Sequence, residues 1–140
     1  MPALCDVSVL LAVCYDRHSH HQAALAWLNA QPERSTVLCR VTQISLLRLL
    51  CSTTVMGEDV CTLPEAWVIY DAIIGDERLY FVAEPESLDS VFRRFTQLAA
   101  VSPKVWADAY LAAFASIAGL QLVTFDRGFR QFKDLQLVLL

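Results

Sequence analysis

Three aspartates stand in otherwise apolar surroundings and could do chemistry together. Asp6 follows the apolar segment PALC, Asp108 lies within WADAYLAAFA, and Asp126 ends LVTFD. A carboxylate among apolar residues is costly to bury without a partner, and converging carboxylates raise one another's pKa unless a cation neutralises them. Oxygen ligands without histidine or cysteine select Mg²⁺ or Mn²⁺. Such ions generate hydroxide and stabilise phosphate charge during in-line displacement, so the aspartates predict a divalent-metal site for hydrolysis at phosphate.

Each aspartate also has a simpler interpretation. Asp126 could cap the turn after its strand, Asp6 could cap the first helix, and Asp108 could be an exposed first-turn acid favoured by the helix dipole. These roles do not require the carboxylates to meet. We favour the metal site because we expect all three at one edge of the domain.

The segment from residue 102 to residue 126 predicts how two of the acids meet. Ser102 as N-cap and Pro103 at the first helical position predict a helix start, and Gly119 predicts its end. The helix is apolar nearly all round, as a buried helix is, and LQLVTF after it predicts a short buried strand. The helix from Asp108 to its end, at roughly 1.5 Å per residue, is nearly as long as the strand that returns, at roughly 3.3 Å per residue. Asp108 and Asp126 should therefore share the edge at which open α/β sheets bind ligands.

The rest of the chain predicts strands that alternate with helices. We expect further strands over 2–6, 35–41, 79–83 and 136–140. Further helices are expected after Asp6 with Ser8 as its cap, over 18–31 with Ser19 as its cap, from Thr42, over 62–74 and over 87–98. One continuous strand through Tyr15 is the alternative for the N-terminus. This order predicts an α/β fold: one domain over 1–140, with a mostly parallel sheet of about five strands, helices on both faces and the last strand at an edge.

Composition narrows the function classes. The chain has 140 residues, of which 56% are hydrophobic and 19% charged. This predicts a sheet buried on both faces or an apolar surface covered by a partner. A net charge of -4 argues against a surface that coats nucleic acid in general, yet it is compatible with a nuclease whose acidic site holds cations.

Other signals place the chain in the cytoplasm and away from membranes. The apolar stretch 109–125 is too short and too interrupted for a membrane span, and no secretion signal is visible at the N-terminus. The five cysteines form no C-x-x-C pair, which favours reduced thiols. The run His18 to His21 lacks a cysteine pair at zinc-ligand spacing, so a solvated helix start is the favoured interpretation.

With these motifs the chain resembles the PIN-domain ribonucleases, and more closely the VapC toxins of bacterial and archaeal toxin–antitoxin pairs. The resemblance extends over essentially the whole chain. It includes the DVSVLLAV start with Asp6, the H-S-H-H run from His18, and T-Q-x-x-x-L-R-L from Thr42. Its most specific parts are WADAYLAAFA with Asp108 and LVTFDRGF with Asp126.

The resemblance implies a PIN-like three-layer sandwich and a metal-dependent endoribonuclease with Asp6, Asp108 and Asp126 as its catalytic, metal-binding acids. The implied cofactor is Mg²⁺, with Mn²⁺ as an alternative. Thr124 would point its hydroxyl toward the same site. The family's fourth acid, a glutamate, is missing, because Gln43 and Ser45 stand where it would be sought. A neutral ligand there implies weaker metal affinity, or one ion instead of two.

Basic and apolar residues suggest contacts beyond the acids. Arg127 and Arg48 are the basic residues nearest in sequence to this edge and are candidates for phosphate contact. Trp67, Tyr70 and Ile74 share one helix face, which could be a homodimer seam or an antitoxin groove, or simply core. The resemblance implies RNA as substrate and a cognate antitoxin as partner.

Two other functions remain open from the sequence. A PIN-like module weakened by the loss of its fourth acid could act only as a protein- or RNA-binding unit. A phosphoryl-transfer domain with Asp6 as nucleophile is less favoured, because Ser8 stands where a second acid is expected and no lysine follows the later strand.

Overall fold

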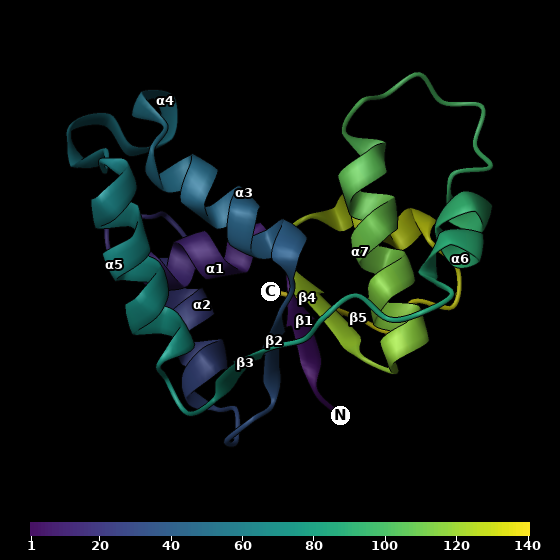
Figure 1. The fold of residues 1–140 in the computed structure, drawn as a ribbon, viewed down its shortest axis with the longest axis horizontal. Helices are drawn as coiled ribbons and strands as arrows, with labels where there is room; N and C mark the ends of the chain where they lie inside the picture. Colours follow the sequence, from purple (N-terminus) through teal and green to yellow (C-terminus); the bar gives the residue numbers. More distant parts are fainter.

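Five short strands form one parallel sheet in a computed structural model that describes residues 1–140 (Figure 1). The strands are β1 (Ala3–Cys5), β2 (Thr36–Leu38), β3 (Leu79–Phe81), β4 (Gln121–Thr124) and β5 (Leu137–Leu139). Their order is β3-β2-β1-β4-β5, and every neighbouring pair is parallel. The predicted five-stranded parallel sheet with its last strand at an edge is therefore confirmed.

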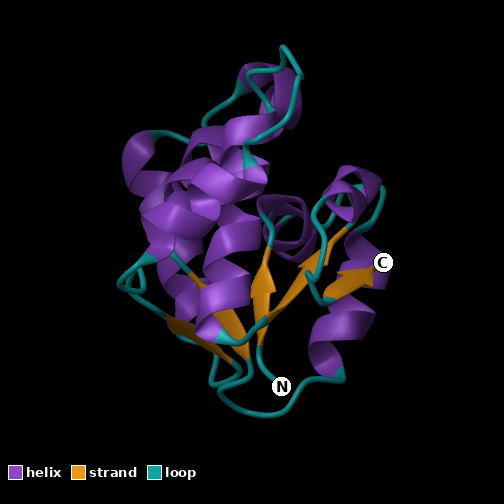
Figure 2. Ribbon diagram, turned by 90° about the vertical axis from the view of Figure 1, so that its right-hand side faces the viewer, coloured by secondary structure: helices purple, strands orange, loops and turns teal.

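Seven helices cover the two faces of this sheet (Figures 1 and 2). On one face lie α1 (Val7–Cys14), α2 (His21–Asn29), α3 (Arg40–Leu50), α4 (Thr53–Met56) and α5 (Leu63–Ile74). On the other face lie α6 (Leu88–Phe95) and α7 (Val105–Ala118). Two short 3₁₀ helices, η1 (Gly57–Asp59) and η2 (Arg127–Gln131), complete the chain. The arrangement is the three-layer sandwich that the resemblance implied.

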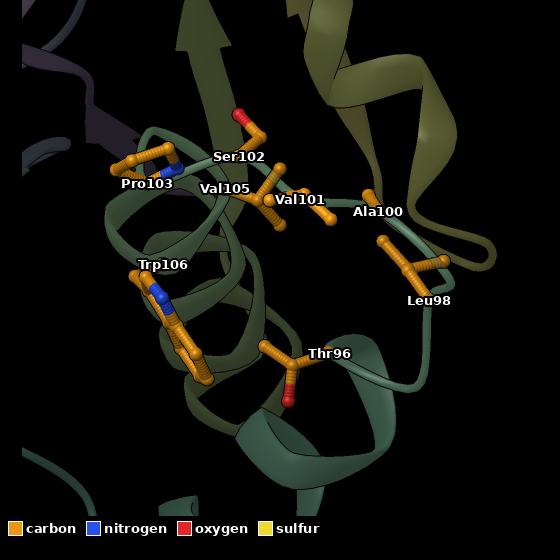
Figure 3. Close-up of a pocket in the computed structure, with 8 residues that line it drawn as sticks. All are labelled: Thr96, Leu98, Ala100, Val101, Ser102, Pro103, Val105 and Trp106. Atoms are coloured by element: carbon orange, nitrogen blue, oxygen red, sulfur yellow. The ribbon is translucent and has the colours of Figure 1, made fainter.

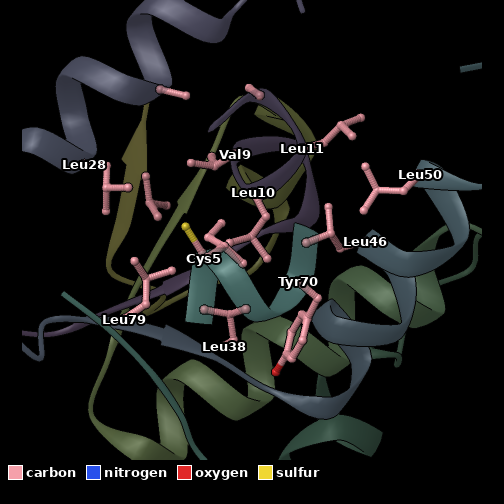
Figure 4. Packing of buried hydrophobic residues seen from close by; sticks show 14 of the residues in the cluster. Cys5, Val9, Leu10, Leu11, Leu28, Leu38, Leu46, Leu50, Tyr70 and Leu79 are labelled. Atoms are coloured by element: carbon pink, nitrogen blue, oxygen red, sulfur yellow. The ribbon is translucent and has the colours of Figure 1, made fainter. Parts of the chain in front are cut away.

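Residues of β1 alternate between two hydrophobic cores. Ala3 and Cys5 pack into the cluster under α1, α3 and α5, which Figure 4 shows, whereas Leu4 packs into the cluster under α7. In β4, Val123 packs into the first of these clusters and Leu122 into the second. Burial of the sheet on both faces accounts for the high apolar content, as parallel sheets require.

The first helix begins two residues earlier than Ser8 as its cap predicted. Asp6 is the N-cap of α1 and accepts a hydrogen bond from the Val7 N–H, while Ser8 lies inside the helix and donates its hydroxyl to Asp6. The prediction of Ser8 as cap was wrong, because a carboxylate already accepted the free N–H group. The alternative of one strand through Tyr15 is excluded.

Further boundaries differ from the prediction. The second helix starts at His21 rather than at His18, and its N-cap is His20 rather than Ser19. Strand β2 is shorter than predicted and ends at Leu38. The N-cap of α3 is Cys39 rather than Thr42. The Thr42 hydroxyl, at the third helical position, accepts a hydrogen bond from the Cys39 N–H. That reciprocal arrangement is a capping box. The prediction took Thr42, its third helical residue, for the N-cap.

The helix that carries Asp108 begins at Val105, after the N-cap Lys104, and not at Ser102. Its end is as predicted: Gly119 is the C-cap with φ 67, a left-handed conformation that glycine adopts without steric cost. No helix of the chain is both long enough and apolar enough to cross a bilayer.

Candidate active site

Asp6 stands at the carboxyl end of β1 and is almost fully buried, with 7% of its surface exposed. Its Oδ1 accepts from the Val7 N–H at 2.8 Å, and its Oδ2 accepts from the Ser8 hydroxyl at 3.0 Å and from the Thr124 hydroxyl at 2.7 Å. Burial raises the pKa of Asp6, and these hydrogen bonds oppose the rise. The carboxylate is thus held in a fixed orientation.

Thr124 links this carboxylate to the next strand. It is the last residue of β4, is fully buried, and its hydroxyl also accepts from the Asp126 N–H at 2.9 Å. One hydroxyl therefore donates to Asp6 and accepts from Asp126. This hydroxyl therefore holds the turn that carries Asp126 at a fixed position relative to β1.

Asp126 caps the 3₁₀ helix η2 and pairs with a lysine. Its Oδ1 accepts from the Gly128 N–H at 2.8 Å, and its Oδ2 lies 2.9 Å from Lys104 Nζ. The lysine is the main cause of the lowered pKa of Asp126. A Cβ at Gly128 would lie 3.0 Å from Asp126 Oδ1, so glycine permits the carboxylate to approach this backbone.

Asp108 approaches from the opposite layer, in the first turn of α7. Burial raises its pKa to about 6, and the negative charges of Asp6 and Asp126 add to the rise, whereas Lys104 opposes it. Because the charges of Asp6 and Asp126 act on Asp108, the three predicted acids lie within electrostatic range of one another. The ammonium of Lys104 pairs with Asp126, and the charges of Asp108 and Asp6 act on it as well.

The ligand types at this site suit a hard divalent ion, but the side chains do not surround an ion position in this conformation. Carboxylate and hydroxyl oxygens are the ligands that Mg²⁺ and Mn²⁺ prefer, and Lys104 shows that the cluster attracts a cation. In this conformation no three acidic, histidine or cysteine side chains lie close enough together to hold an ion by themselves. An ion bound to Asp126 would compete with Lys104, and water would complete its ligands.

Gln43 is buried in the first turn of α3, at the carboxyl end of β2. Its Oε1 accepts from the guanidinium of Arg40, which also lies over the ring of Phe81. No hydrogen bond joins Gln43 or Ser45 to the three acids. Arg40 was missed by the sequence reasoning, because the predicted strand was extended through position 41; a basic residue directly after a strand was the available signal.

The two arginines chosen from the sequence have different positions. Arg127 is exposed and is the first residue of η2, directly after Asp126. Arg48 lies roughly 12 Å further along α3 than Arg40 and lines an apolar groove with Ile44 and Trp67. The structure brings Arg127 to the edge with the acids and leaves Arg48 in that groove.

The histidine run also reaches this edge, which the sequence did not indicate. The ring of His20 stacks on Phe125 with centroids 4.5 Å apart, and Phe125 lies between Thr124 and Asp126. His21 Nδ1 lies 2.7 Å from the Ala12 carbonyl oxygen. The run therefore joins α2 to α1 and packs against the turn that carries Asp126.

Comparisons with known proteins agree with this architecture. A family model described as PIN domain matches residues 3–135. The chain is 43% identical to Ribonuclease VapC41 of Mycobacterium tuberculosis, with 98% of this chain and 97% of that protein covered. It is 32% identical to Ribonuclease VapC44 of the same organism, with 91% and 87% covered.

Solved structures of low identity show the same fold. VapBC2 from Rickettsia felis, bound to a promoter DNA fragment, has a TM-score of 0.72 at 12% identity and covers 100% of this chain and 99% of that chain. VapC20 of M. tuberculosis, a sarcin–ricin loop cleaving toxin, has a TM-score of 0.66 at 14% identity, with 91% and 92% covered. The chain therefore belongs to the PIN-domain family, among the VapC ribonucleases.

Proposed function

We propose that this protein is a metal-dependent endoribonuclease toxin that cleaves RNA phosphodiester bonds and is neutralised by a cognate antitoxin. Relatives over the full length are named ribonucleases, and several structural neighbours are toxin–antitoxin complexes. The observation that carries the proposal is the coupling of Asp6, Asp108 and Asp126 at the carboxyl edge of the sheet. Three acids from β1, α7 and the end of β4 gather negative charge there, which a bound divalent cation would relieve.

The roles of these residues follow from their contacts. A bound Mg²⁺ or Mn²⁺ would supply a hydroxide and stabilise the charge on phosphate. Asp6, oriented by Ser8 and Thr124, and the half-buried Asp108 would hold the ion, with Asp126 as the third ligand. Gln43, a neutral group bonded to Arg40, would not add the charge of a fourth acid. We therefore favour one ion over two.

Exposed basic residues at the same edge suit the phosphate groups of the substrate. Arg127 follows Asp126 directly, and Arg40 lies at the start of α3 with its guanidinium over Phe81. Both are exposed, so both can contact a phosphate without leaving a buried site. Arg48 is dropped from this role, because it lines the apolar groove between α3 and α5.

That apolar groove is our candidate for the partner surface. It has a volume of about 530 Å³ and is lined by exposed Ile44, Leu63 and Trp67. Tyr70, which the sequence analysis placed on the same face, is only 6% exposed and belongs to the core. An antitoxin helix or a second copy of the chain would cover the groove. Trp67→Asp should abolish either the binding of the antitoxin or the association of two copies of the chain. Size-exclusion chromatography with and without the antitoxin shows which of the two is lost.

One observation favours a second function. Lys104 already neutralises Asp126, and the acids do not form a closed metal cluster, so the domain could bind RNA or protein without cleaving. Expression with and without the antitoxin, beside an Asp108→Asn variant, separates the two functions. Growth arrest and RNA cleavage that Asp108→Asn abolishes support the nuclease, whereas arrest that persists in this variant supports the binding module.

A further inference from the structure

The charge of the chain is divided unevenly between its two parts. Residues 88–140 carry six Lys and Arg against four Asp and Glu, whereas residues 1–87 carry five against eleven. Two of the four acids in the second part are the candidate ligands Asp108 and Asp126, and a third, Asp89, pairs with Arg93. Glu84 lies against α7, where it accepts a hydrogen bond from the Tyr110 hydroxyl, so the excess of cations is confined to η2 and the end of α6 in a protein whose net charge is negative.

The unpaired cations on this side gather along η2 and the end of α6. Arg94, Arg127, Arg130 and Lys133 are all exposed, and none forms an ion pair. In a 3₁₀ helix, side chains three residues apart eclipse one another at roughly 6 Å along the axis. Arg127 and Arg130 therefore form a row on the outer side of η2, because Phe129 between them is buried. The row starts directly beside Asp126.

The row leads to a groove between η2 and α6. This groove has a volume of about 500 Å³, with Arg94 and Gln97 on one wall and Gln131 and Lys133 on the other. One carboxylate, Asp134, also lines it. A groove with cationic and amide donors on both walls suits a chain of phosphates better than an apolar helix.

A second hollow adjoins the groove and is apolar. Leu98 lines both hollows. Figure 3 shows Trp106 on α7 at one side of this second hollow, and Leu98 and Val101 on the loop at the other side. The indole of Trp106 is 61% exposed although it meets Phe92 edge to face. An exposed indole beside a basic groove is the combination that binds unpaired bases and their backbone in single-stranded nucleic acids.

We propose that η2, the end of α6 and Trp106 form the surface along which a single-stranded segment of RNA extends from the acids. This inference rests on the proposed function, because it takes the cleaved polymer as the ligand. Arg127 and Arg130 bind phosphates next to the cleaved bond, Arg94 and Lys133 bind those further on, and Trp106 stacks on a base.

The test is salt-dependent binding of a labelled single-stranded oligoribonucleotide of mixed sequence, measured by fluorescence anisotropy. The full-length chain carries Asp108→Asn throughout, so that the RNA stays intact. Arg130→Gln/Lys133→Gln should reduce the slope of log K against log salt by about 1.4, since each single-strand phosphate contact contributes about 0.7. At low salt we expect affinity to fall roughly tenfold.

The matched control is Arg17→Gln/Arg34→Gln, which removes two exposed cations from the first part of the chain. It should leave the slope within a few tenths of its starting value. Trp106→Ala should weaken binding to the single strand roughly tenfold and leave binding to the same strand annealed to its complement unchanged. Arg94→Gln/Arg127→Gln removes the same charge from the same surface and replaces the first variant if that variant fails to fold.

A slope for Arg130→Gln/Lys133→Gln equal to that of the Arg17→Gln/Arg34→Gln control would overturn the proposal, as would RNA binding that neither Arg130→Gln/Lys133→Gln nor Trp106→Ala changes. Either result would leave a partner protein as the occupant of the groove. Cleavage by the chain without the Asp108→Asn change is measured separately. Its absence would count against the nuclease, and the binding slopes would still decide the RNA surface.

Discussion

The Thr124 hydroxyl donates a 2.7 Å hydrogen bond to Asp6 Oδ2 across two neighbouring parallel strands. The pairing of Cys5 with Val123 places these residues opposite each other, one step beyond the last paired residues of β1 and β4. The same hydroxyl accepts from the Asp126 N–H. A single buried threonine therefore sets the spacing of two acids that lie 120 positions apart in sequence.

Thr124→Val should keep the volume of this side chain and remove both hydrogen bonds. Asp6 would lose a donor in a buried place, so we expect a loss of about 1–3 kcal/mol in unfolding free energy. Cleavage should fall roughly tenfold to a hundredfold, since the carboxylate is no longer oriented. Urea denaturation and an RNA cleavage assay measure the two effects. Thr124→Ser is the control, and equal activity of the two variants would contradict the orienting role.

Asp108→Asn should stabilise the fold while it abolishes cleavage. The pKa of Asp108 is raised to about 6 in the folded state, against an ordinary value of 3.8. Above pH 6 the ionised carboxylate therefore destabilises the folded chain by roughly 1–3 kcal/mol, and this penalty disappears as pH falls from 6 to below 3.8. Thermal unfolding of the metal-free protein at pH 7.5 and pH 4 measures it. The account fails here if the variant is no more stable than the parent at pH 7.5.

Lys104→Met should tighten the binding of Mn²⁺. The ammonium occupies Asp126 Oδ2 at 2.9 Å, and its removal frees that oxygen and leaves the local charge more negative. An exposed ion pair is worth about 1 kcal/mol or less, so an increase of about fivefold in affinity is expected. Isothermal titration calorimetry with Mn²⁺ measures the change, and Lys133→Met controls for the general loss of one positive charge. Weaker binding by Lys104→Met would mean that Lys104 supports the ion.

Asp76 and Arg78 should make stability depend on pH in the acid range. The Arg78 guanidinium donates to both Asp76 oxygens and also bonds Asn29, and it lowers the pKa of Asp76 to about 2. A depressed folded pKa stabilises the protein above the unfolded value of 3.8, and this is lost as pH falls toward 2. Asp76→Asn should cost about 1 kcal/mol at pH 7 and little at pH 2, by urea denaturation. The same loss at both pH values would argue against the ion pair.

The parts of the fold that the sequence predicted well depend on local patterns. Alternating strands and helices and the Gly119 helix end are set by residues near one another in the chain. The wrong helix starts have a common reason: Ser8, Ser19, Thr42 and Ser102 are all plausible caps. Asp6 took the place of Ser8, and a reciprocal bond made Cys39 the cap instead of Thr42. The helices α2 and α7 begin after His20 and Lys104 without a side-chain cap bond, and spacing alone reveals none of these outcomes.

Contacts within the candidate site were harder to predict. The three aspartates could be selected because each is an acid among apolar residues. The pairing of Lys104 with Asp126 and the stacking of His20 on Phe125 join segments about 20 or more than 100 positions apart. No local pattern marks either contact, because both depend on how a loop returns to the sheet edge.

The central claim is that Asp6, Asp108 and Asp126 form a divalent-metal site that cleaves RNA. The most direct measurement is cleavage of RNA by the purified chain after chelation and again after Mn²⁺ or Mg²⁺ is restored, with Asp108→Asn in parallel. Asp108 is the suitable position because, unlike Asp6 and Asp126, it caps no helix. We predict cleavage only with restored metal and only with Asp108 intact. Cleavage that survives chelation, or that folded Asp108→Asn retains, would contradict the account.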